Sequence, residues 1–423
     1  MAAFAGAAVL LPGAAVAAPG DTIGPINPVA QPLGSHAANS GFLVFVEGDV
    51  ELNADEAEGT LALGGDLSFQ TPYNIAAGSV PPGTFIAPGD TSPTYLYVGG
   101  GVAFPDDAGV VLKVLNNGFT KIADTTTYDA FDTDQNNTVG PHHVVPPGGS
   151  YETQPRIEGT ITQTPTSIET PVPADLIDVD GAFALYRDTT TTLSRCAPTI
   201  DFANRDDGAP LTPPYAEGTA ARLTLVPGET NVVTLAAADL DALAEITFPD
   251  GGPSPDTPLL VNVTGTAFSG TIPNLAGLSG ANAPFILWNF PEATSVTVTG
   301  GATLEGTIYA PNADVNWQVT QNIEGNVIAA SFIHGQPAAT PVGSPREVHN
   351  FPFAAELTCL ESGDSIPPDP TDPPTDPSTP PGPTNPDQAL PATGTDAFPG
   401  MVAAAALAAA GAAATAIGSR RRA

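Results

Sequence analysis

The chain has 423 residues, with 11 lysines and arginines against 45 aspartates and glutamates, so its formal net charge is −34. This negative potential repels nucleic acids and anionic polymers, which excludes a nucleic-acid partner and suits a soluble surface protein. Glycine (44) and proline (47) are frequent, and short runs of Val, Ile, Leu and Thr alternate with Gly and Asn, which predicts many short strands joined by tight turns.

Residues 1–17 have the layout of a signal peptide. An apolar run from Ala2 to Leu11 is broken by Pro12 and Gly13, and Ala15-Val16-Ala17 matches the small-x-small pattern of a signal-peptidase site. The segment is short for a membrane span. No Lys or Arg precedes the apolar run, so either the true start lies upstream or the signal is weak; a buried Ala-rich helix is the alternative.

Residues 36–360 are expected to form the folded domain, and they contain a weak internal repeat. A Glu-Gly pair recurs in AEGTLA, IEGTIT, LEGTIYA and IEGNVIA, which start at residues 57, 157, 304 and 323. The last two start 19 residues apart, which is the length of one coil of a β-solenoid. The sequence therefore predicts a mostly β domain, a parallel β-solenoid with glycine at the corners. A β-sandwich is the rival fold, but it offers no reason for this recurrence.

Two stretches have helical spacing instead. Residues 173–196 place apolar side chains near a helical period, with Asp175 suited to the first turn, and residues 236–246 are rich in alanine. We expect one or two helices that flank the solenoid and cover apolar surface and open strand edges.

Several polar groups were weighed as metal sites. Asp132, Asp134 and Asn136 have the alternate spacing of a calcium loop, but His143 stands where the closing carboxylate would fall. A solvated polar turn is the alternative, so calcium stays a weak candidate and no other cofactor is expected. His142 and His143 are adjacent, but zinc would need further ligands from the remaining histidines, which are His36, His334 and His349.

The repeated glutamates raise the question of an enzyme. Glu58, Glu158, Glu305 and Glu324 each precede a glycine of the repeat, and carboxylate pairs can cleave glycosides. A residue that recurs from coil to coil is better explained as part of the repeat turn than as a catalytic acid. We therefore expect no catalytic residue.

Aromatic and threonine-rich strands could form binding surfaces. Trp288, Phe290 and Trp317 could stack on a carbohydrate, but such residues more often belong to the core. The alternating run Ser295–Thr299 resembles the threonine ladders that bind ordered water, although a single run is typical of any solvent-facing strand.

Covalent cross-links have few candidates. The two cysteines, Cys196 and Cys359, could pair in an exported protein, although their separation in sequence leaves this open. With only Lys113 and Lys121 as donors before the C-terminal arginines, Lys–Asn isopeptide bonds are not expected.

The C-terminal region has three parts. Residues 362–389 form a Pro-rich linker without core-forming residues, which predicts an extended disordered spacer. Residues 397–418 are apolar enough to reach across a bilayer, and residues 419–423 carry three arginines that stay cytoplasmic.

Between the linker and the apolar segment, Leu390-Pro391-Ala392-Thr393-Gly394 resembles the LPXTG sorting signal of Gram-positive surface proteins. The resemblance implies that a sortase attacks the carbonyl of Thr393, releases the chain from Gly394 onward, and joins Thr393 to an amine of peptidoglycan. Sortase and peptidoglycan are thus the implied partners.

The domain also resembles a known family. GFLVFVEGDVELNADEAEGTLALGGDLSF (41–69) is similar to the start of the choice-of-anchor A domain, an adhesive module of bacterial surface proteins. NAPFILWNFPEATSVTVTGGATLEGTIYAPNADVNW (282–317), NIEGNVIAASFIHG (322–335) and EVHNFPF (347–353) are similar to its closing half.

These features together indicate a secreted, wall-anchored adhesin, whose extracellular ligand could be a glycan or a host surface. A surface enzyme active on polysaccharides and a structural coat protein that binds nothing are the alternatives.

Overall fold

The computed structural model describes residues 20–78, 83–336 and 346–362, which belong to one compact unit. The predicted signal peptide, the linker after Ser362, the sorting motif, the apolar segment and the basic tail lie outside the described residues. Among the residues that are described, no helix is both long and apolar enough to cross a membrane.

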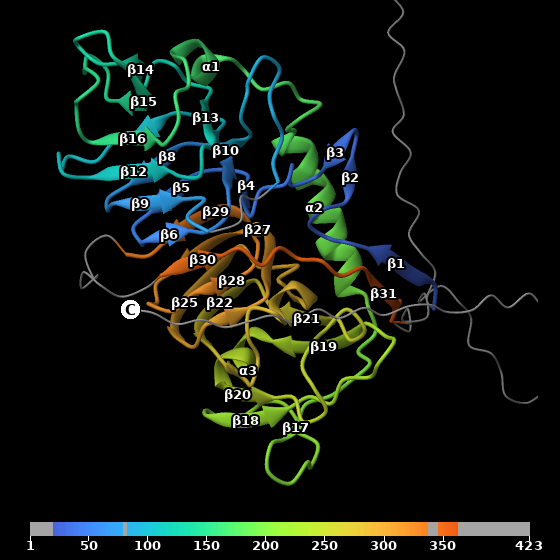
Figure 1. The fold of residues 1–423 in the computed structure, drawn as a ribbon. Coiled ribbons are helices and arrows are strands. Elements are labelled where there is room, and N and C mark those ends of the chain that lie inside the picture. Colours follow the sequence, from blue (N-terminus) through green and yellow to red (C-terminus); the bar gives the residue numbers. More distant parts are fainter. Residues whose placement is uncertain (1–19, 79–82, 337–345, 363–423) are drawn as a thin grey trace, which may run out of the picture. The chain divides into compact units, whose positions relative to one another are not determined.

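Three stacks of mostly parallel strands form the body of the domain (Figure 1), which confirms the predicted solenoid. The first stack follows, in spatial order, β13 (Phe119–Ile122), β10 (Thr94–Val98), β7 (Leu61–Leu63), β4 (Val44–Val46), β29 (Val327–His334), β27 (Thr307–Trp317), β24 (Ile286–Asn289), β21 (Leu259–Thr264) and β19 (Asn231–Ala236).

The second stack shares two strands with the first, because β27 and β29 are long enough to continue from one stack into the other. It contains β11 (Val102–Ala103), β8 (Leu67–Phe69), β5 (Val50–Leu52), the C-terminal halves of β29 and β27, β25 (Ser295–Gly301) and β22 (Ala267–Ile272).

The third stack begins with an antiparallel hairpin and is parallel from there on. Its order is β14 (Asp129–Thr133), β15 (Val139–Val145), β16 (Arg156–Gly159), β12 (Val111–Val114), β9 (Tyr73–Ile75), β6 (Glu56–Ala57), β30 (Glu347–His349), β28 (Ile323–Glu324) and β26 (Leu304–Glu305).

The remaining strands lie outside these stacks. β1 (Thr22–Ile26) pairs antiparallel with β31 (Leu357–Leu360), and β2 (Pro32–Leu33) pairs with β3 (His36–Ala37). A four-stranded sheet contains β17 (Ala203–Asn204), β18 (Thr219–Arg222), β20 (Leu243–Thr247) and β23 (Asn274–Ala276).

The coils do not stack in chain order. β4 pairs with β7 on one side and with β29 on the other, so the first coil of the chain lies against the last. Figure 1 shows this as blue strands next to orange ones. The chain builds outward from β4 to β13, passes along helix α2 (Val179–Ser194), and resumes at β19. It then returns coil by coil toward β4.

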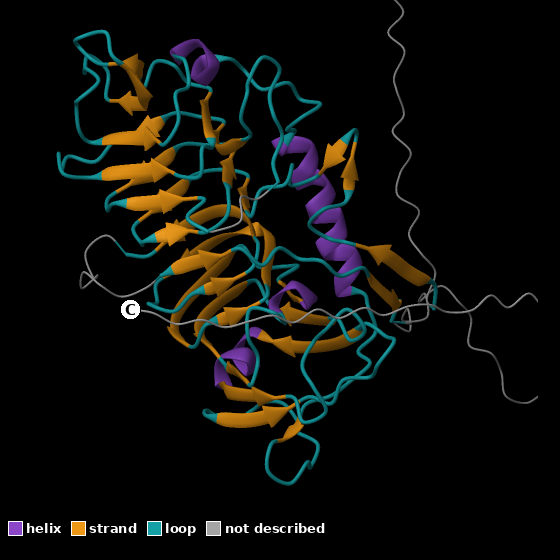
Figure 2. Cartoon of the chain, in the orientation of Figure 1, coloured by secondary structure: helices purple, strands orange, loops and turns teal. Residues whose placement is uncertain are grey.

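Helix α2 lies along the first stack (Figure 2) and starts at Val179, six residues later than the sequence predicts. Asp178 caps it by accepting a hydrogen bond from the Gly181 N–H. The Phe183 ring stacks on Phe45 with centroids 5.8 Å apart, and Tyr186 meets Tyr309 edge-on at 5.7 Å. The predicted flanking helix therefore does cover apolar surface.

The second predicted helix is present but shorter than the predicted stretch 236–246. Only α3 (Ala237–Ala242) is helical, whereas Ala236 ends β19 and Leu243 begins β20. Pairing of Ala236 with Thr264 and of Ile246 with Ala221 draws both ends into sheets, so tertiary pairing prevails over alanine's helical propensity. Two short helices were not predicted, α1 (Pro165–Glu169) and the 3-10 turn η1 (Ala283–Phe285).

Glycine at the repeat corners has a steric reason. Gly306 has a φ of +117°, and a Cβ there would lie 2.8 Å from the Ile286 carbonyl oxygen. A Cβ on Gly325 would lie 2.6 Å from the Gly306 carbonyl oxygen in the next coil. Because no side chain fits at these two corners, each of them requires the glycine of its Glu-Gly pair.

Candidate functional site

One surface of the solenoid is covered with small hydroxyl and amide side chains, and we call it the hydroxyl face. It is the outer side of the second stack in its C-terminal coils. Its side chains alternate with buried ones such as Val296, Val298 and Val315. The members are Ser269, Ser295, Thr297, Thr299, Asn316 and Ser331.

Strand register aligns these side chains into rows. Ser269, Thr297 and Asn316 are direct partners on three adjacent strands, and Ile333 follows on the next. A parallel row joins Ser295, Asp314 and Ser331. Parallel strands lie about 4.8 Å apart and alternate residues about 6.6 Å apart, so the rows form a regular two-dimensional array. Only the Ser295–Thr299 run can be recognised in the sequence, because the rows across strands depend on the register between coils.

The outer side of the third stack is charged, and we call it the acidic face. It places Glu305, Glu324 and His349 as successive register partners. A second row contains Glu347, Glu56, Asn74, Lys113, Glu158 and His143. The repeated glutamates thus lie in strands or directly after one, just before the corner glycines. Sequence reasoning placed them in turns, and it did not identify Glu347 or Glu56.

His349 is the electrostatic centre of the acidic face. Its ring nitrogens lie 2.8 Å from Glu324 Oε1 and 2.6 Å from Glu347 Oε2. The hydrogen bond to Glu324, supported by that to Glu347, raises the pKa of His349 to about 9 against the effect of burial. Burial, with a smaller effect of Glu324, raises the pKa of Glu305 to about 7.

The predicted calcium loop is a hairpin turn between β14 and β15. Asp134 Oδ1 accepts hydrogen bonds from the backbone N–H of Asn136 at 2.7 Å and of Thr138 at 2.8 Å. These bonds lower the pKa of Asp134 and occupy the carboxylate, as in an Asx turn. Within the described ranges, no three His, Cys, Asp or Glu side chains are grouped so that they could hold a metal ion.

The adjacent histidines point to opposite sides of β15. His142 is buried, with Nε2 3.1 Å from Thr120 Oγ1 and Nδ1 3.2 Å from the Ile161 carbonyl, and burial lowers its pKa to about 4. His143 instead stacks on Tyr151 at 3.9 Å. The two rings cannot converge on one ion.

The candidate aromatic surface belongs to the core. Trp288, Phe290 and Trp317 are each exposed by 1% or less. The indole N–H of Trp288 donates to the Glu305 carbonyl at 3.0 Å, and that of Trp317 donates to the Gln321 carbonyl at 2.7 Å.

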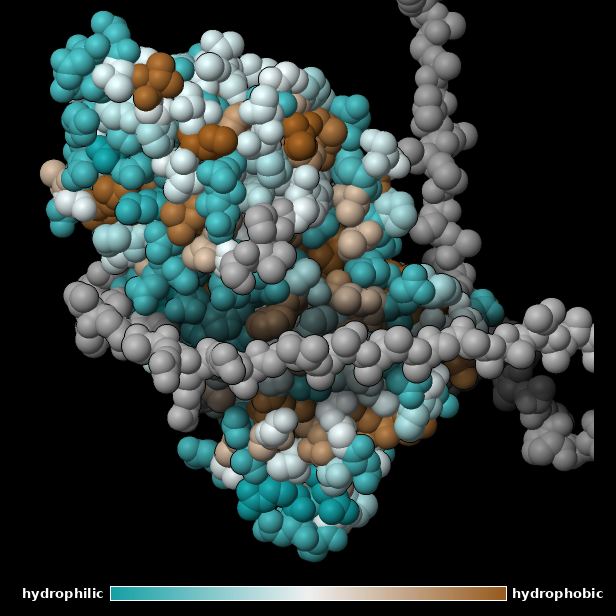
Figure 3. Space-filling model, in the orientation of Figure 1, coloured by the Kyte–Doolittle hydropathy of each residue, from teal (hydrophilic) through white to brown (hydrophobic). Residues whose placement is uncertain are grey.

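In Figure 3 hydrophobic side chains are scattered among hydrophilic ones on the face in view. Large exposed apolar side chains include Ile86, Val139, Val226 and Leu360.

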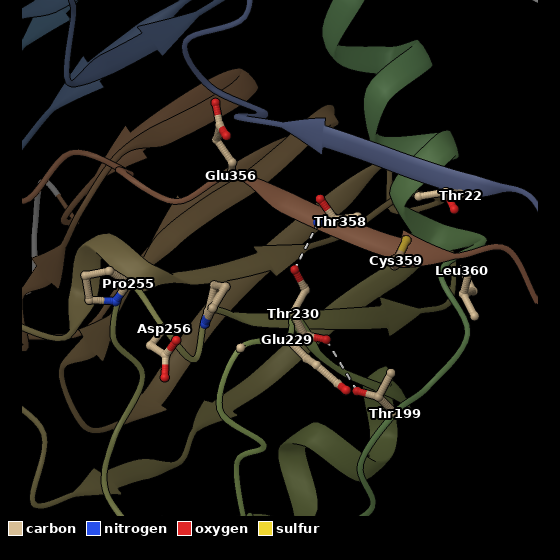
Figure 4. A pocket seen from close by; sticks show the side chains of 12 residues that line it. Thr22, Thr199, Glu229, Thr230, Pro255, Asp256, Glu356, Thr358, Cys359 and Leu360 are labelled. Carbon is tan, nitrogen blue, oxygen red and sulfur yellow. Dashed lines mark hydrogen bonds between the residues drawn. The ribbon is translucent and has the colours of Figure 1, made fainter. Parts of the chain in front are cut away.

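The two cysteines are joined by a disulfide, with Cα atoms 5.5 Å apart. A cavity of about 570 Å³ lies beside it (Figure 4). Cys359 and Thr358 form one side, the turns around Glu229 and Asp256 form the other, and the Thr358 N–H donates to Thr230 Oγ1 at 2.9 Å. Glu229, Asp256 and Glu356 give the cavity an acidic lining.

The lysines differ in their surroundings. Lys113 is exposed on the acidic face. Lys121 is buried, and its Nζ lies 2.8 Å from Asp90 Oδ2 and donates to the Ser167 carbonyl at 2.6 Å. This ion pair ties α1 and the loop before β10 to the last strand of the first stack.

Comparison with known proteins adds two family matches. The model described as "Putative Ice-binding-like adhesive domain" matches residues 35–339, more than half of the chain, and that of the "LPXTG cell wall anchor motif" matches residues 382–423. Comparison with curated proteins found no match. Among solved structures, the DUF3494 domain of an ice-binding protein from Shewanella frigidimarina is 16% identical with a TM-score of 0.27, covering 78% of this chain and 99% of that one.

Proposed function

The chain belongs to the ice-binding-like adhesive domain family and is a sortase-anchored cell wall protein, and we propose that it is an adhesin whose ligand binds the hydroxyl face. The observation that carries this proposal is the register that aligns Ser269, Thr297 and Asn316 across neighbouring strands. An array of this kind presents regularly spaced polar groups to one extended partner.

The other two faces suit a ligand less well. Helix α2 covers the first stack, where Phe183 and Tyr186 seal the surface. The acidic face carries five or more carboxylates whose hydration would have to be removed on contact. Apart from Asp314, which accepts a hydrogen bond from Ser331, the named residues of the hydroxyl face are small and neutral. Such side chains are hydrated less strongly, so this face can approach a solid surface at a lower desolvation cost than the acidic face.

The ligand that fits is an ordered array of hydroxyl groups. Ice and crystalline polysaccharide share this chemistry, and both repeat at a few ångströms, as does the strand spacing of about 4.8 Å. The family description names ice-binding-like adhesion, which favours a solid over a single soluble sugar.

The test compares two tyrosine variants. Thr297→Tyr would interrupt the row with a bulky ring, whereas Lys113→Tyr places the same ring on the acidic face as a matched control. We expect Thr297→Tyr to lower retention on ice, cellulose or chitin by roughly tenfold or more and Lys113→Tyr to change it little. Loss with both variants, or with neither, would rule out the hydroxyl face. Retention on none of these solids would instead favour a coat protein.

We further propose that Thr393 is the residue joined to peptidoglycan, on the basis of its place in the sorting motif. Mass spectrometry of wall material released by muramidase should find a peptide that ends at Thr393 and carries a peptidoglycan remnant. A peptide that continues through Gly394 in the wall fraction would contradict this.

The polysaccharide-active alternative rests on Glu305 and Glu324. They are register partners, and the raised pKa of Glu305 would suit a general acid. Glu324, however, is bonded to His349 and only 9% exposed. An assay would incubate the protein with wall or host polysaccharides and measure soluble cleavage products. Products formed by wild type but not by Glu305→Gln would favour this alternative over the adhesin.

A further inference from the structure

We propose that residues 195–197 and 359–362 form a disulfide-reinforced clamp that passes mechanical load from the wall anchor into the solenoid. We call these residues the exit clamp, because the chain leaves the described domain at Ser362 toward the linker and the sorting signal. A protein anchored at its C-terminus is pulled at this point whenever its ligand moves away from the cell. The inference rests on wall anchoring and not on which face binds the ligand.

Four contacts of three kinds meet at the exit clamp: a disulfide, an ion pair and two backbone hydrogen bonds. Cys196 and Cys359 are covalently joined. The Arg195 guanidinium lies 3.1 Å from the carboxylate of Glu361, whose side chain is 7% exposed.

Backbone hydrogen bonds run in both directions across the same junction. The Ala197 N–H donates to the Leu360 carbonyl at 2.8 Å, and the Ser362 N–H donates to the Arg195 carbonyl at 2.8 Å. The second of these hydrogen bonds involves Ser362, the last residue of the chain that the structure describes.

On its other side, the clamp continues into helix α2, which is hydrogen-bonded to the first stack. Cys196 follows the last turn of α2, where the Leu193 carbonyl accepts from Asn262 Nδ2 at 3.0 Å. One turn earlier, Thr190 Oγ1 and Asn289 Oδ1 are hydrogen-bonded at 2.5 Å. Load on Cys359 therefore passes through Cys196 into α2, and from there into strands β21 and β24 of the first stack.

Without the disulfide, the load would meet a weak element first. β31 has four residues, and β1 is its antiparallel partner, with an irregular register between Ile23 and Ile26. Tension applied at Ser362 would first break its hydrogen bond to Arg195 and would then break the bonds of β31 one after another, starting from Leu360. The disulfide at Cys359 stops this peeling after the first residues, because covalent bonds do not open at such loads.

The test pulls the protein at the anchored end in both redox states. One handle follows Thr393, and the other is a bioorthogonal amino acid at exposed Ser269 on β22, so the load crosses the clamp whichever face binds. The chain has two cysteines and both are in this disulfide, so a reductant acts on no other bond. At constant force, we expect reduction of the disulfide to shorten the time that the folded domain survives before its first unfolding extension by roughly tenfold or more. Equal lifetimes in the two states would overturn the proposal.

Hydrogen exchange separates a clamp from a general staple. After reduction, amides of β31 and β1 should exchange faster, whereas those of β24 and β27 should keep their protection. Faster exchange throughout the domain would mean that the disulfide stabilises the whole fold, and it would also overturn the clamp. The variant Cys196→Ser/Cys359→Ser should show the same exchange pattern as the reduced wild-type protein. If that variant does not fold, the reduced wild-type protein alone supplies the comparison.

Discussion

The side-chain amide of Gln163 pairs with the backbone of Thr120 as a neighbouring strand would. Its Oε1 accepts from the Thr120 N–H and its Nε2 donates to the Thr120 carbonyl, both at 2.8 Å. Thr120 lies in β13, the last strand of the first stack. At the opposite end, Thr199 pairs with Val232 of β19 in a similar way through its backbone N–H and Oγ1. Side chains thus close both edges, which would otherwise attract another chain.

Replacing Gln163 with Glu should open the β13 edge. The carboxylate would face the Thr120 carbonyl without a donor, and we expect a loss of about 2–4 kcal/mol in the free energy of unfolding, with some concentration-dependent association. Urea unfolding and light scattering measure the two effects. Gln70→Glu, at an exposed site, is the matched control. Equal stability of the two variants would show that the edge does not depend on this amide.

The corner glycines should tolerate no side chain. Gly306→Ala combines a strained φ with a contact of 2.8 Å to Ile286, so we expect a loss on the order of 3 kcal/mol, measured by chemical denaturation. Gly83→Ala, where a Cβ meets nothing within 4 Å, should change the stability by less than about 0.5 kcal/mol. An unchanged free energy of unfolding in Gly306→Ala would mean that the backbone at this corner can shift to accommodate a side chain.

His349 and Glu305 should each make the stability of the domain fall as the pH rises, whereas buried His142 and His334, whose pKa values are lowered to about 4 and about 3, act in the opposite direction below about pH 6.5. Both His349 and Glu305 have a folded pKa above the unfolded value, so protonation favours the folded state for each. The contribution of Glu305 is complete below about pH 4.5 and is lost through pH 7. That of His349 is complete below about pH 6.5 and is lost through pH 9.

Urea midpoints measured from pH 4 to 10 can assign the two steps. Compared with wild type, His349→Gln should lose the fall in stability between pH 6.5 and 9, whereas Glu305→Gln should lose the fall that Glu305 contributes between pH 4.5 and 7. Each variant is the control for the other. Midpoints that rise with pH across the upper range would contradict the sign.

The acidic cavity should slow reduction of the disulfide by anionic thiols. Thiolate attack on Cys359 passes through a cavity lined by Glu229, Asp256 and Glu356, and their field repels negative reagents. Cationic cysteamine should therefore act several-fold faster than mercaptopropionate at low salt, after correction for thiolate reactivity, and the difference should shrink at 1 M salt. The variant Glu229→Gln/Asp256→Asn should also reduce the difference between the rates of the two thiols. Equal reduction rates for the two thiols at low salt would show that the carboxylates do not repel anionic thiols from the disulfide.

Much of the fold could be predicted because its cause is local. Alternation of Val296 and Val298 with Ser295 and Thr297 assigns one side of a strand to the core. The Glu-Gly repeat marks corners that exclude a side chain, and the apolar spacing within residues 173–196 marks α2, although Asp178 caps this helix and not Asp175. Burial of Trp288 and Trp317 also follows from composition and pattern.

The candidate site could be predicted only in part. A single strand shows that Thr297 faces outward, but not that Ser269 and Asn316 lie beside it. For the same reason, Glu324 and His349 were noticed separately and not as a pair, because β28 and β30 are joined by chain whose length says nothing about register.

By itself the sequence determined where the protein goes and what its repeating unit is, because the sorting signal and the Glu-Gly corners act through neighbouring residues in the chain. Only the tertiary structure decided that β4 stacks on β29, that α2 seals the first stack, and that Cys196 meets Cys359. Every parallel strand offers the same backbone hydrogen bonds to every other. Which coils become neighbours, and which faces stay open, therefore depends on the packing of side chains that are distant in sequence.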